Sequence, residues 1–483
     1  MTFVAPALAA LPALLALAVV SLPTTAYAQL APHPRVAGTE LNAVELAPRV
    51  GSSDNDRRDW RQIAWNDLAK TTLAAGPYVV RFQVAGGEHL ALEVPVCAGR
   101  GRVLVDGVAV TTAAGPLVLP LPPRPAEAHQ VEIELTVGGY EHRVACGGAP
   151  RFGAQVDTRE GLGVITFPSA YGALGGGKAV VFVPPGHDGS KPGALLVGLH
   201  PWNGGTWTYA AYAELLREAT ARDVILLMPS GLGNSLYTAS AEDEALHAID
   251  AVSHALPVDP RRISLWGASM GGAGATTIGF HHPDKFATVT SFFGDSKYDL
   301  STYVKAILPD EASAHLVNAL DVVDNARNLG VWLVHGEDDH VSPIAQSSML
   351  AQALTDRGFA VRFDRVPHAG HEGSLAARFL IELVDKASEA HVPSFPSRVS
   401  FRSVRPLDAS AYGVHIFRTG GDALVDLERR ADGIHVLKAT NVKTIELTRG
   451  SLGATEGAPI VIDDPAIKVE VRWEASVPVV LPH

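Results

Sequence analysis

The sequence predicts an α/β fold, in which a mostly parallel sheet with helices on both faces is flanked by two small β-sandwich domains. Between residues 194 and 388, short apolar runs typical of strands alternate with helix-like segments, which favours a parallel sheet covered by helices. Residues 40–150 and the stretch after residue 396 instead alternate apolar and polar side chains in short runs, as exposed antiparallel strands do. The length of 483 residues allows two or three domains, each with its own core.

The first segment is predicted to be a signal peptide over residues 1–28. Residues 1–29 contain no charged side chain, and an apolar stretch runs from Leu8 to Leu22. It is followed by Ala26-Tyr27-Ala28, which has the small residues that signal cleavage requires. We therefore expect a secreted or periplasmic protein that has no membrane association after cleavage. The missing basic residues leave an uncleaved membrane anchor as the alternative.

Residues 29–155 are predicted to form the N-terminal β-sandwich. The run Val131–Val137 alternates apolar and polar side chains, and turns are expected at Gly86-Gly87 and Asp106-Gly107. This domain also holds the only two cysteines of the chain, Cys97 and Cys146. In an exported protein, two such cysteines are expected to form a disulfide, with two buried thiols as the alternative.

Residues 156–391 are predicted to form the α/β domain. Its sheet is expected to open with a hairpin of Leu162–Phe167 and Ala179–Pro184. The segment 295–328 is the longest insertion between strands and is expected to form either a small cap or an ordinary helical connection. The remaining predicted elements are strands 194–199, 224–228, 262–266, 289–293, 331–334 and 361–366, and helices 243–256, 270–281 and 374–388.

The run Gly267-Ala268-Ser269-Met270-Gly271 has the Gly-x-Ser-x-Gly pattern of a nucleophile elbow. It stands between an apolar strand and a helix rich in small residues. Glycine is required two residues before and two residues after the serine because the tight turn leaves no room for a Cβ atom. Ser269 is therefore the candidate nucleophile, and a glycine-rich turn with an inert serine is the alternative.

Partners for Ser269 follow later in the chain. Asp339 lies in an acidic loop after strand 331–334, and His371 lies in the loop after strand 361–366. A serine hydroxyl becomes a strong nucleophile when an imidazole accepts its proton and a carboxylate orients that imidazole. We therefore predict a catalytic triad of Ser269, His371 and Asp339. The alternatives are Asp338 or Asp295 as the acid and His368 as the base.

An oxyanion hole needs two N–H groups that point at the same substrate oxygen. We expect one from Met270, directly after the nucleophile, and one from the loop His200–Gly205 that follows strand 194–199. Because Pro201 has no N–H group, Trp202 is the predicted second donor. Trp207 and Tyr209 are predicted to bind substrate, with core packing as the alternative.

With these motifs, the chain resembles the α/β-hydrolase superfamily, in the branch shared by prolyl-oligopeptidase-type catalytic domains, secreted feruloyl and acetyl esterases, and polyhydroxybutyrate depolymerases. The resemblance covers about half of the chain and implies the fold and the triad, but it does not choose between esters and peptides. The residues that carry it are Val258–Ile263, Gly267–Gly272, Pro283–Ala287, His335–Pro343 and Gly370-His371.

Residues 392–483 are predicted to form the C-terminal β-sandwich, after a proline-punctuated linker at 392–396. Asp432-Gly433 indicates a hairpin turn, and Ile467–Trp473 alternates between a buried and a solvated face. We expect both β-sandwiches to pack on the α/β domain and shape its entrance; carbohydrate binding is the alternative role.

Charge and composition narrow the function classes. A net charge of −12 without a basic patch argues against nucleic acid or an anionic membrane as a partner. The 19 histidines include no His-Glu-x-x-His run, so we expect neither a metal site nor an organic cofactor. The sequence therefore predicts an exported serine hydrolase that acts on small or polymeric carboxylic esters. A prolyl-oligopeptidase-like serine peptidase and a binding protein with an inert hydrolase domain are the two alternatives.

Overall fold

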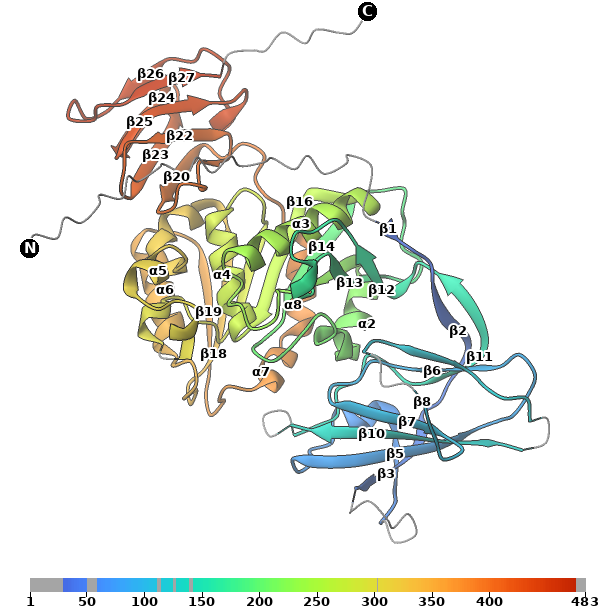
Figure 1. Ribbon diagram of the computed structural model, residues 1–483. Coiled ribbons are helices and arrows are strands. Elements are labelled where there is room, and N and C mark those ends of the chain that lie inside the picture. Colours follow the sequence, from blue (N-terminus) through green and yellow to red (C-terminus); the bar gives the residue numbers. More distant parts are fainter. Residues whose placement is uncertain are drawn as a thin grey trace, which may run out of the picture.

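The computed structural model describes residues 29–49, 59–110, 114–124, 127–138, 142–301 and 303–474. These residues form a central α/β domain with one β-sandwich at each end (Figure 1). This arrangement confirms the predicted fold class. The predicted signal peptide, residues 1–28, lies outside the described residues. In the described part of the chain, we find no helix with the length and apolar character needed to span a membrane.

The central sheet of the described residues has nine strands. The first four, from the β1 edge inward, pair antiparallel, and the pairs from β15 to the β19 edge are all parallel. The predicted hairpin of residues 162–167 and 179–184 is the β12–β13 pair. The spatial order is β1 (Gln29–Leu30), β12 (Gly161–Thr166), β13 (Lys178–Val183), β15 (Val224–Pro229), β14 (Gly193–Leu199), β16 (Val258–Ala268), β17 (Thr288–Phe292), β18 (Gly330–Gly336) and β19 (Val361–Val366).

Helices cover both faces of this sheet, because alternate strand residues are apolar and point in opposite directions. Leu195 and Val197 of β14 pack on one face, and Ala194 and Leu196 pack on the other. The first face is covered by α3 (Ser240–Ala255), α4 (Met270–His281) and α6 (Ala345–Asp356), and the second by α2 (Ala213–Ala221), α7 (Gly373–Ala377) and α8 (Leu380–Glu389).

Two predicted segments of the central domain differ in detail. The helix predicted over 374–388 is broken at Phe379 into α7 and α8, so that α8 can turn its apolar side to the sheet. The insertion 295–328 is a chain of short helices rather than one cap. These are η4 (Tyr298–Leu300), η5 (Tyr303–Ala306), α5 (Glu311–His315) and η6 (Ala319–Asn328).

The N-terminal domain packs two antiparallel sheets around a core that contains both cysteines. One strand of the predicted domain lies elsewhere, because Gln29–Leu30 pairs with β12 and so belongs to the central sheet. The larger sheet has the order β4 (Arg61–Ala64), β3 (Ala43–Pro48), β5 (Gly76–Val84), β10 (His129–Val137), β7 (Arg100–Val105) and β8 (Val108–Val110). The smaller has the order β2 (His33–Glu40), β11 (Arg151–Thr158), β6 (Ala91–Val94) and β9 (Leu117–Pro120); the short helix α1 (Trp65–Leu68) follows β4.

The predicted disulfide is confirmed, since Cys97 and Cys146 are bonded across a sequence separation of 49 residues. Closing a loop of this size removes entropy from the unfolded chain that corresponds to about 4 kcal/mol in the chain-entropy model. We therefore expect reduction of this disulfide to lower the urea concentration at which half of the N-terminal domain is unfolded. Tryptophan fluorescence measures this unfolding. The double variant Cys97→Ser and Cys146→Ser serves as the control and should show no further effect of reductant. Equal midpoints for oxidised and reduced protein would contradict this expectation.

The C-terminal domain is a second β-sandwich whose two four-stranded sheets enclose a separate apolar core. The hairpin predicted at Asp432-Gly433 joins β23 and β24. One sheet has the order β20 (Arg398–Ser403), β23 (Ala423–Arg430), β24 (Gly433–Thr440) and β26 (Ile460–Ile462), and the other β21 (Ser410–Ala411), β22 (Val414–Arg418), β25 (Val442–Leu447) and β27 (Glu470–Trp473).

Buried charges join the C-terminal domain to the central domain. Arg405 makes two contacts with the Glu242 carboxylate, at 2.8 and 2.5 Å, and a third with Asp408 at 2.7 Å. Asp408 also lies 2.5 Å from Nδ1 of His281, and Glu242 lies 2.7 Å from Nε2 of His282. Burial alone would raise the pKa of Glu242, but the hydrogen bonds from His282 and Arg405 lower it from 4.5 to about 2.

This network predicts that acid weakens the folded protein. A carboxyl group whose pKa is lowered by folding adds stability above its unfolded pKa and loses it as the pH falls towards the folded value. For Glu242, the loss should occur between pH 4.5 and pH 2 and amount to on the order of 3 kcal/mol. Urea unfolding at several pH values should show a shallower pH dependence for Glu242→Gln. The neighbouring exposed residue provides the control Asp243→Asn, and equal slopes for Glu242→Gln and the wild type would contradict the role of the network.

Candidate active site

The turn that carries Ser269 is as tight as the glycine pattern predicts. Strand β16 ends at Ala268, helix α4 begins at Met270, and Ser269 between them has φ 55° and ψ −120°. A Cβ atom on Gly267 would lie 2.3 Å from the backbone of Gly271, and one on Gly271 would lie 1.8 Å from the Leu199 carbonyl oxygen. Only glycine fits at both positions. The Ser269 N–H donates to the Phe292 carbonyl at 2.9 Å, which ties the turn to β17.

The structure brings the three predicted triad residues together. Nε2 of His371 lies 2.8 Å from Oγ of Ser269, and Nδ1 of the same ring lies 2.8 Å from Oδ2 of Asp339. The three residues follow β16, β18 and β19, whose carboxyl ends lie at one edge of the parallel sheet. A continuous hydrogen-bonded chain therefore runs from the hydroxyl through the imidazole to the carboxylate.

The surroundings of Asp339 keep its carboxyl group ionised. Its Oδ1 accepts hydrogen bonds from the N–H groups of Val341 and Ser342, at 2.8 and 2.9 Å. The His335 ring lies 3.4 Å from Oδ2. Burial alone would raise the pKa of Asp339, but the contacts with His335, His371 and the Val341 N–H hold it well below its usual range. The carboxylate can therefore orient the His371 ring and stabilise a positive charge on it.

The His371 ring packs on an apolar side chain and keeps access to the surface. The ring of Phe293 meets it edge to face, with centroids 4.8 Å apart, and the His371 side chain is 15% exposed. Phe293 follows β17 with a positive φ of 43°, and its N–H donates to the Val334 carbonyl. This contact restricts the ring to the orientation in which Nε2 faces Ser269.

The contacts described for the alternative acids and base are with residues other than Ser269 and His371. The Asp338 and His368 side chains are 61% and 95% exposed and lie 3.8 Å from each other. Asp295 is buried and accepts hydrogen bonds from Oγ of Ser301 at 2.7 Å and from Oγ of Ser342 at 2.5 Å. Since the Ser342 N–H donates to Asp339, Asp295 helps to hold the loop that carries Asp339 through its contact with Ser342.

The two predicted oxyanion donors stand on neighbouring loops. Met270 is the first residue of α4, where a helix has N–H groups without partners inside the helix. Trp202 occupies the second position of a turn closed by a hydrogen bond from the Gly204 N–H to the Pro201 carbonyl at 2.9 Å. This turn follows β14, and β14 pairs with β16 so that Leu199 lies beside Gly267.

The structure separates Trp207 and Tyr209, the two aromatic residues predicted to bind substrate. Trp207 is half-buried and lines a groove beside the 201–204 turn. Tyr209 is only 2% exposed, and its OH donates to the Leu199 carbonyl and accepts from the Ala268 N–H. Its ring also packs on Trp266. The assignment of Tyr209 to substrate binding is therefore corrected: it is a core residue that fixes β14 against the nucleophile turn.

Sequence reasoning missed the residues that hold the acid loop. Nε2 of the buried His335 lies 2.7 Å from the Ser342 carbonyl, and Nδ1 lies 2.8 Å from Oγ of Ser347. Because a carbonyl oxygen only accepts, Nε2 carries the proton. A histidine at the end of a buried strand was the available signal for this role, since a buried imidazole must find polar partners.

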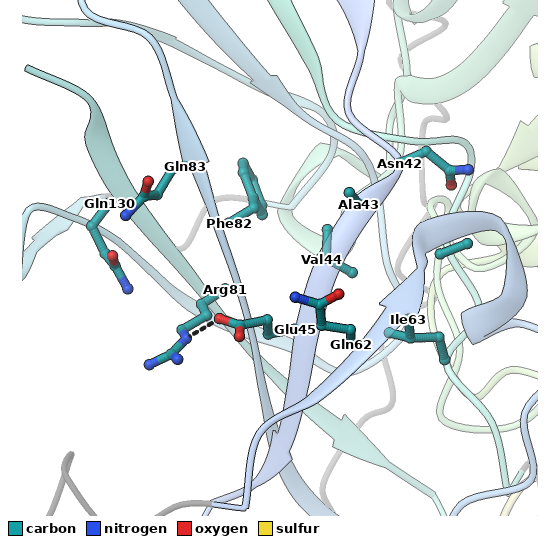
Figure 2. A pocket seen from close by; sticks show the side chains of 11 residues that line it. Asn42, Ala43, Val44, Glu45, Gln62, Ile63, Arg81, Phe82, Gln83 and Gln130 are labelled. Carbon is teal, nitrogen blue, oxygen red and sulfur yellow. Dashed lines mark hydrogen bonds and ion pairs between the residues drawn. The ribbon is translucent and has the colours of Figure 1, made fainter.

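A separate hollow of about 790 Å³ lies on the outer face of the larger N-terminal sheet and contains none of the predicted site residues (Figure 2). Its outward side chains are polar, including Gln62, Gln83 and Gln130, and Arg81 pairs with Glu45. Such a row is typical of the solvated face of an antiparallel sheet. Among the described residues, no group of three or more His, Cys, Asp or Glu side chains is arranged to hold a metal ion.

The fold and the site together define the central domain as an α/β-hydrolase domain of the serine hydrolase type. Residues 237–387, which include Ser269, Asp339 and His371, match the model of the prolyl oligopeptidase family. No curated protein sequence matches the chain.

Solved structures that match part of the chain include three hydrolases. An S-formylglutathione hydrolase from Agrobacterium tumefaciens is 16% identical, with a TM-score of 0.41 over 48% of this chain and 95% of the other. A fluorophosphonate-binding serine hydrolase of Staphylococcus aureus is 17% identical, with a TM-score of 0.39 over 47% of this chain and 97% of the other. A puromycin-hydrolyzing peptidase of Mycobacterium tuberculosis is 23% identical, with a TM-score of 0.37 over 44% of this chain and 37% of the other.

Proposed function

We propose that the protein is an exported serine hydrolase that cleaves carboxylic esters, with Ser269, His371 and Asp339 as its catalytic triad. The observation that carries this proposal is the hydrogen-bonded chain from Oγ of Ser269 through His371 to Asp339, with both distances at 2.8 Å. The disulfide between Cys97 and Cys146 supports export, because disulfides persist in oxidising compartments. The predicted signal peptide over residues 1–28 points in the same direction.

The reaction begins when Oγ of Ser269 attacks the ester carbonyl carbon while Nε2 of His371 accepts the hydroxyl proton. The negative charge on the former carbonyl oxygen is stabilised by the N–H groups of Met270 and Trp202. The C–O bond to the alcohol then breaks, and His371 returns the proton to the leaving oxygen. A water molecule attacks the acyl-enzyme with the same help from His371, which releases the acid and restores the Ser269 hydroxyl.

A serine peptidase is the second candidate, because the same residues can cleave an amide and residues 237–387 match the prolyl oligopeptidase model. Peptidases of that type usually carry a large propeller before the catalytic domain. Here the described residues that precede the central domain form a β-sandwich, which favours ester substrates. A binding protein with an inert hydrolase domain is disfavoured by the three polar residues in hydrogen-bond contact.

The test is a panel of p-nitrophenyl esters and p-nitroanilide peptides of matched acyl groups, run in parallel on the purified protein. Because a p-nitrophenyl ester is intrinsically easier to cleave than the matching anilide, the deciding observation is turnover of the anilides. We expect the esters to be cleaved and the anilides to stay intact. Anilide cleavage that Ser269→Ala abolishes would establish the peptidase instead. Folded protein that cleaves neither series and is not labelled by a fluorophosphonate would favour the inert binding protein.

A further inference from the structure

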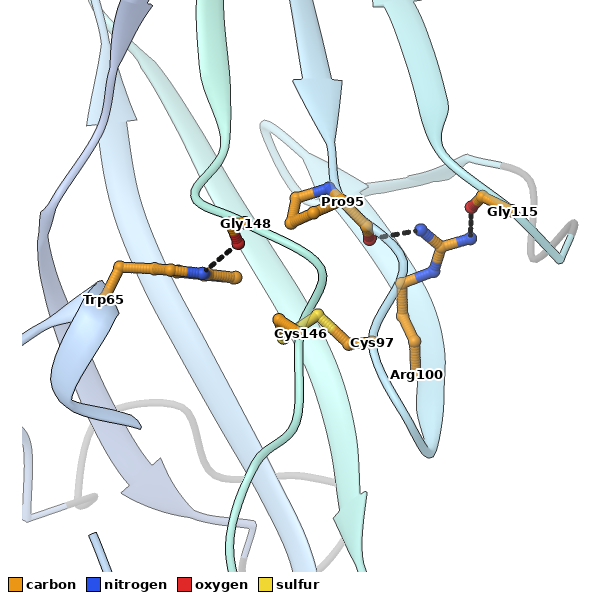
Figure 3. Close-up of a disulfide and its surroundings, with 7 residues drawn as sticks. All are labelled: Trp65, Pro95, Cys97, Arg100, Gly115, Cys146 and Gly148. Atoms are coloured by element: carbon orange, nitrogen blue, oxygen red, sulfur yellow. Dashed lines mark hydrogen bonds between the residues drawn. A yellow bond between two sulfur atoms is a disulfide. The ribbon is translucent and has the colours of Figure 1, made fainter. Parts of the chain in front are cut away.

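A groove of about 470 Å³ lies between the N-terminal domain and the central domain. The N-terminal domain contributes residues 96–100 together with Ala114 and Gly115, and the central domain contributes residues 201–204, Trp207, Thr208 and Tyr212. Figure 3 shows several residues of the N-terminal wall, including the disulfide, Arg100 and Gly115. A cavity of this volume can hold a substantial part of a small-molecule ligand.

The N-terminal wall of the groove is cross-linked. Cys97 is bonded to Cys146, and the neighbouring Ala98 N–H donates to the Ala145 carbonyl at 2.8 Å. The Arg100 guanidinium donates to the carbonyl oxygens of Pro95 and Gly115, at 2.8 and 2.7 Å, and so joins two loops (Figure 3). These contacts hold the wall in one shape.

The wall is also docked closely on the central domain. A Cβ atom on Gly147, next to the disulfide, would lie 2.0 Å from the Ala210 carbonyl oxygen, so the two backbones touch. A Cβ atom on Gly115 would lie 2.9 Å from the Trp207 ring, so this indole packs directly on the Gly115 backbone. The central-domain side is fixed as well, because Asn203 and Asn234 exchange two hydrogen bonds, at 2.7 and 2.8 Å.

The groove is lined by the segment that follows β14, and β14 pairs with β16, the strand that leads into the nucleophile turn. Trp202, which is 37% exposed, lines the groove. The backbone of His200, two residues before Trp202, contacts the nucleophile turn. A Cβ atom on Gly271 would lie 2.9 Å from the His200 carbonyl oxygen. His371 reaches Ser269 from the other side, because it follows β19 at the far edge of the sheet, whereas the groove follows β14. The alcohol oxygen of an ester must lie near Nε2 of His371 to be protonated, which leaves the acyl group on the side of the groove.

The groove suits an acyl group without charge. Arg100 is the one charged side chain among the described residues that line it, and its guanidinium already binds two carbonyl oxygens. The central-domain side offers two indole rings and a phenol ring, from Trp202, Trp207 and Tyr212. Aromatic surfaces of this kind bind large apolar groups by contact area rather than by ionic pairing.

We propose that this groove is an acyl-binding subsite for a large uncharged acyl group, and that the N-terminal domain builds one of its two walls. The inference rests on the proposed esterase function. It gives the N-terminal β-sandwich a role in substrate choice, in addition to packing.

The test varies the acyl group at a constant leaving group, with p-nitrophenyl acetate, 4-phenylbutanoate and hemisuccinate as substrates. We expect the wild type to prefer the phenylbutanoate and to disfavour the charged hemisuccinate. The variant Ala98→Phe fills the groove from the N-terminal domain while keeping the backbone hydrogen bond of residue 98. It should lower the ratio of kcat/KM for phenylbutanoate over acetate by about 10-fold or more.

Two further variants separate the subsite from a loss of folding. Trp207→Ala removes an aromatic ring from the opposite wall and should lower the same ratio. Trp60→Ala is the matched control, because this tryptophan belongs to the same N-terminal domain but does not line the groove. Its ring centroid lies 3.8 Å from Cζ of Arg81. The control variant should leave the ratio unchanged. If the wild type cleaves esters but Ala98→Phe keeps the wild-type ratio, the subsite is overturned while the esterase function stands; a folded wild type that cleaves no ester overturns both.

Discussion

Replacing Ser269 with alanine is expected to lower kcat for ester hydrolysis by about 10⁴-fold or more and to abolish labelling by a fluorophosphonate. In the proposed mechanism the hydroxyl forms the acyl-enzyme, and its Oγ lies 2.8 Å from Nε2 of His371, the base that accepts its proton. KM should change much less than kcat, because the proposed groove and the oxyanion donors belong to other residues. Hydrolysis of p-nitrophenyl acetate and in-gel fluorescence of the labelled protein measure the two effects.

Ser190→Ala is the control for this variant, since Ser190 lies on an exposed loop and bonds only to the nearby Asp188 in the contacts described. It should label and turn over like the wild type. The melting temperatures of both variants establish that they are folded. Full ester hydrolysis by folded Ser269→Ala would show that the nucleophile is a different group, and the proposed triad would fail.

The nucleophile turn could be predicted from sequence because its geometry depends on neighbours in the chain. Gly267 and Gly271 are required by backbone contacts within the same turn and with Leu199. The glycine pattern therefore predicts the turn. The strands of the central sheet were predictable for a related reason. Strands buried on both faces are continuous apolar runs, and these stand out from the polar loops between them.

Other features depend on contacts between distant segments and could not be read from local patterns. Tyr209 and Trp207 are two residues apart and equally aromatic, yet one is in the core and the other lines the groove. The difference arises because the Tyr209 hydroxyl bridges Leu199 and Ala268, which are far from each other in the chain. Helices α2 and α6 were not anticipated either, and the strand Gln29–Leu30 joins the central sheet through pairing with β12, which its own two residues do not encode.

Replacing Asp339 with asparagine is expected to lower kcat by about 10³- to 10⁴-fold while leaving the fold intact. The direction follows from the two oxygens of Asp339. Oδ1 accepts two backbone N–H groups, from Val341 and Ser342, so the asparagine oxygen must take that place. Its NH₂ group then faces Nδ1 of His371, where Oδ2 stands in the wild type.

The NH₂ group can bind His371 only if Nδ1 acts as an acceptor, which moves the ring proton to Nε2. The nitrogen that faces Oγ of Ser269 then carries a proton and cannot accept the one from the hydroxyl. Asp338→Asn is the matched control, since it makes the same chemical change one residue away on an exposed side chain. It should change kcat by less than about two-fold, as surface substitutions outside a site do. Equal losses of kcat in the two variants would mean that Asp339 acts through the net charge of its loop rather than by orienting His371. Asp295, which accepts a hydrogen bond from Ser342, would then be the acid to replace next.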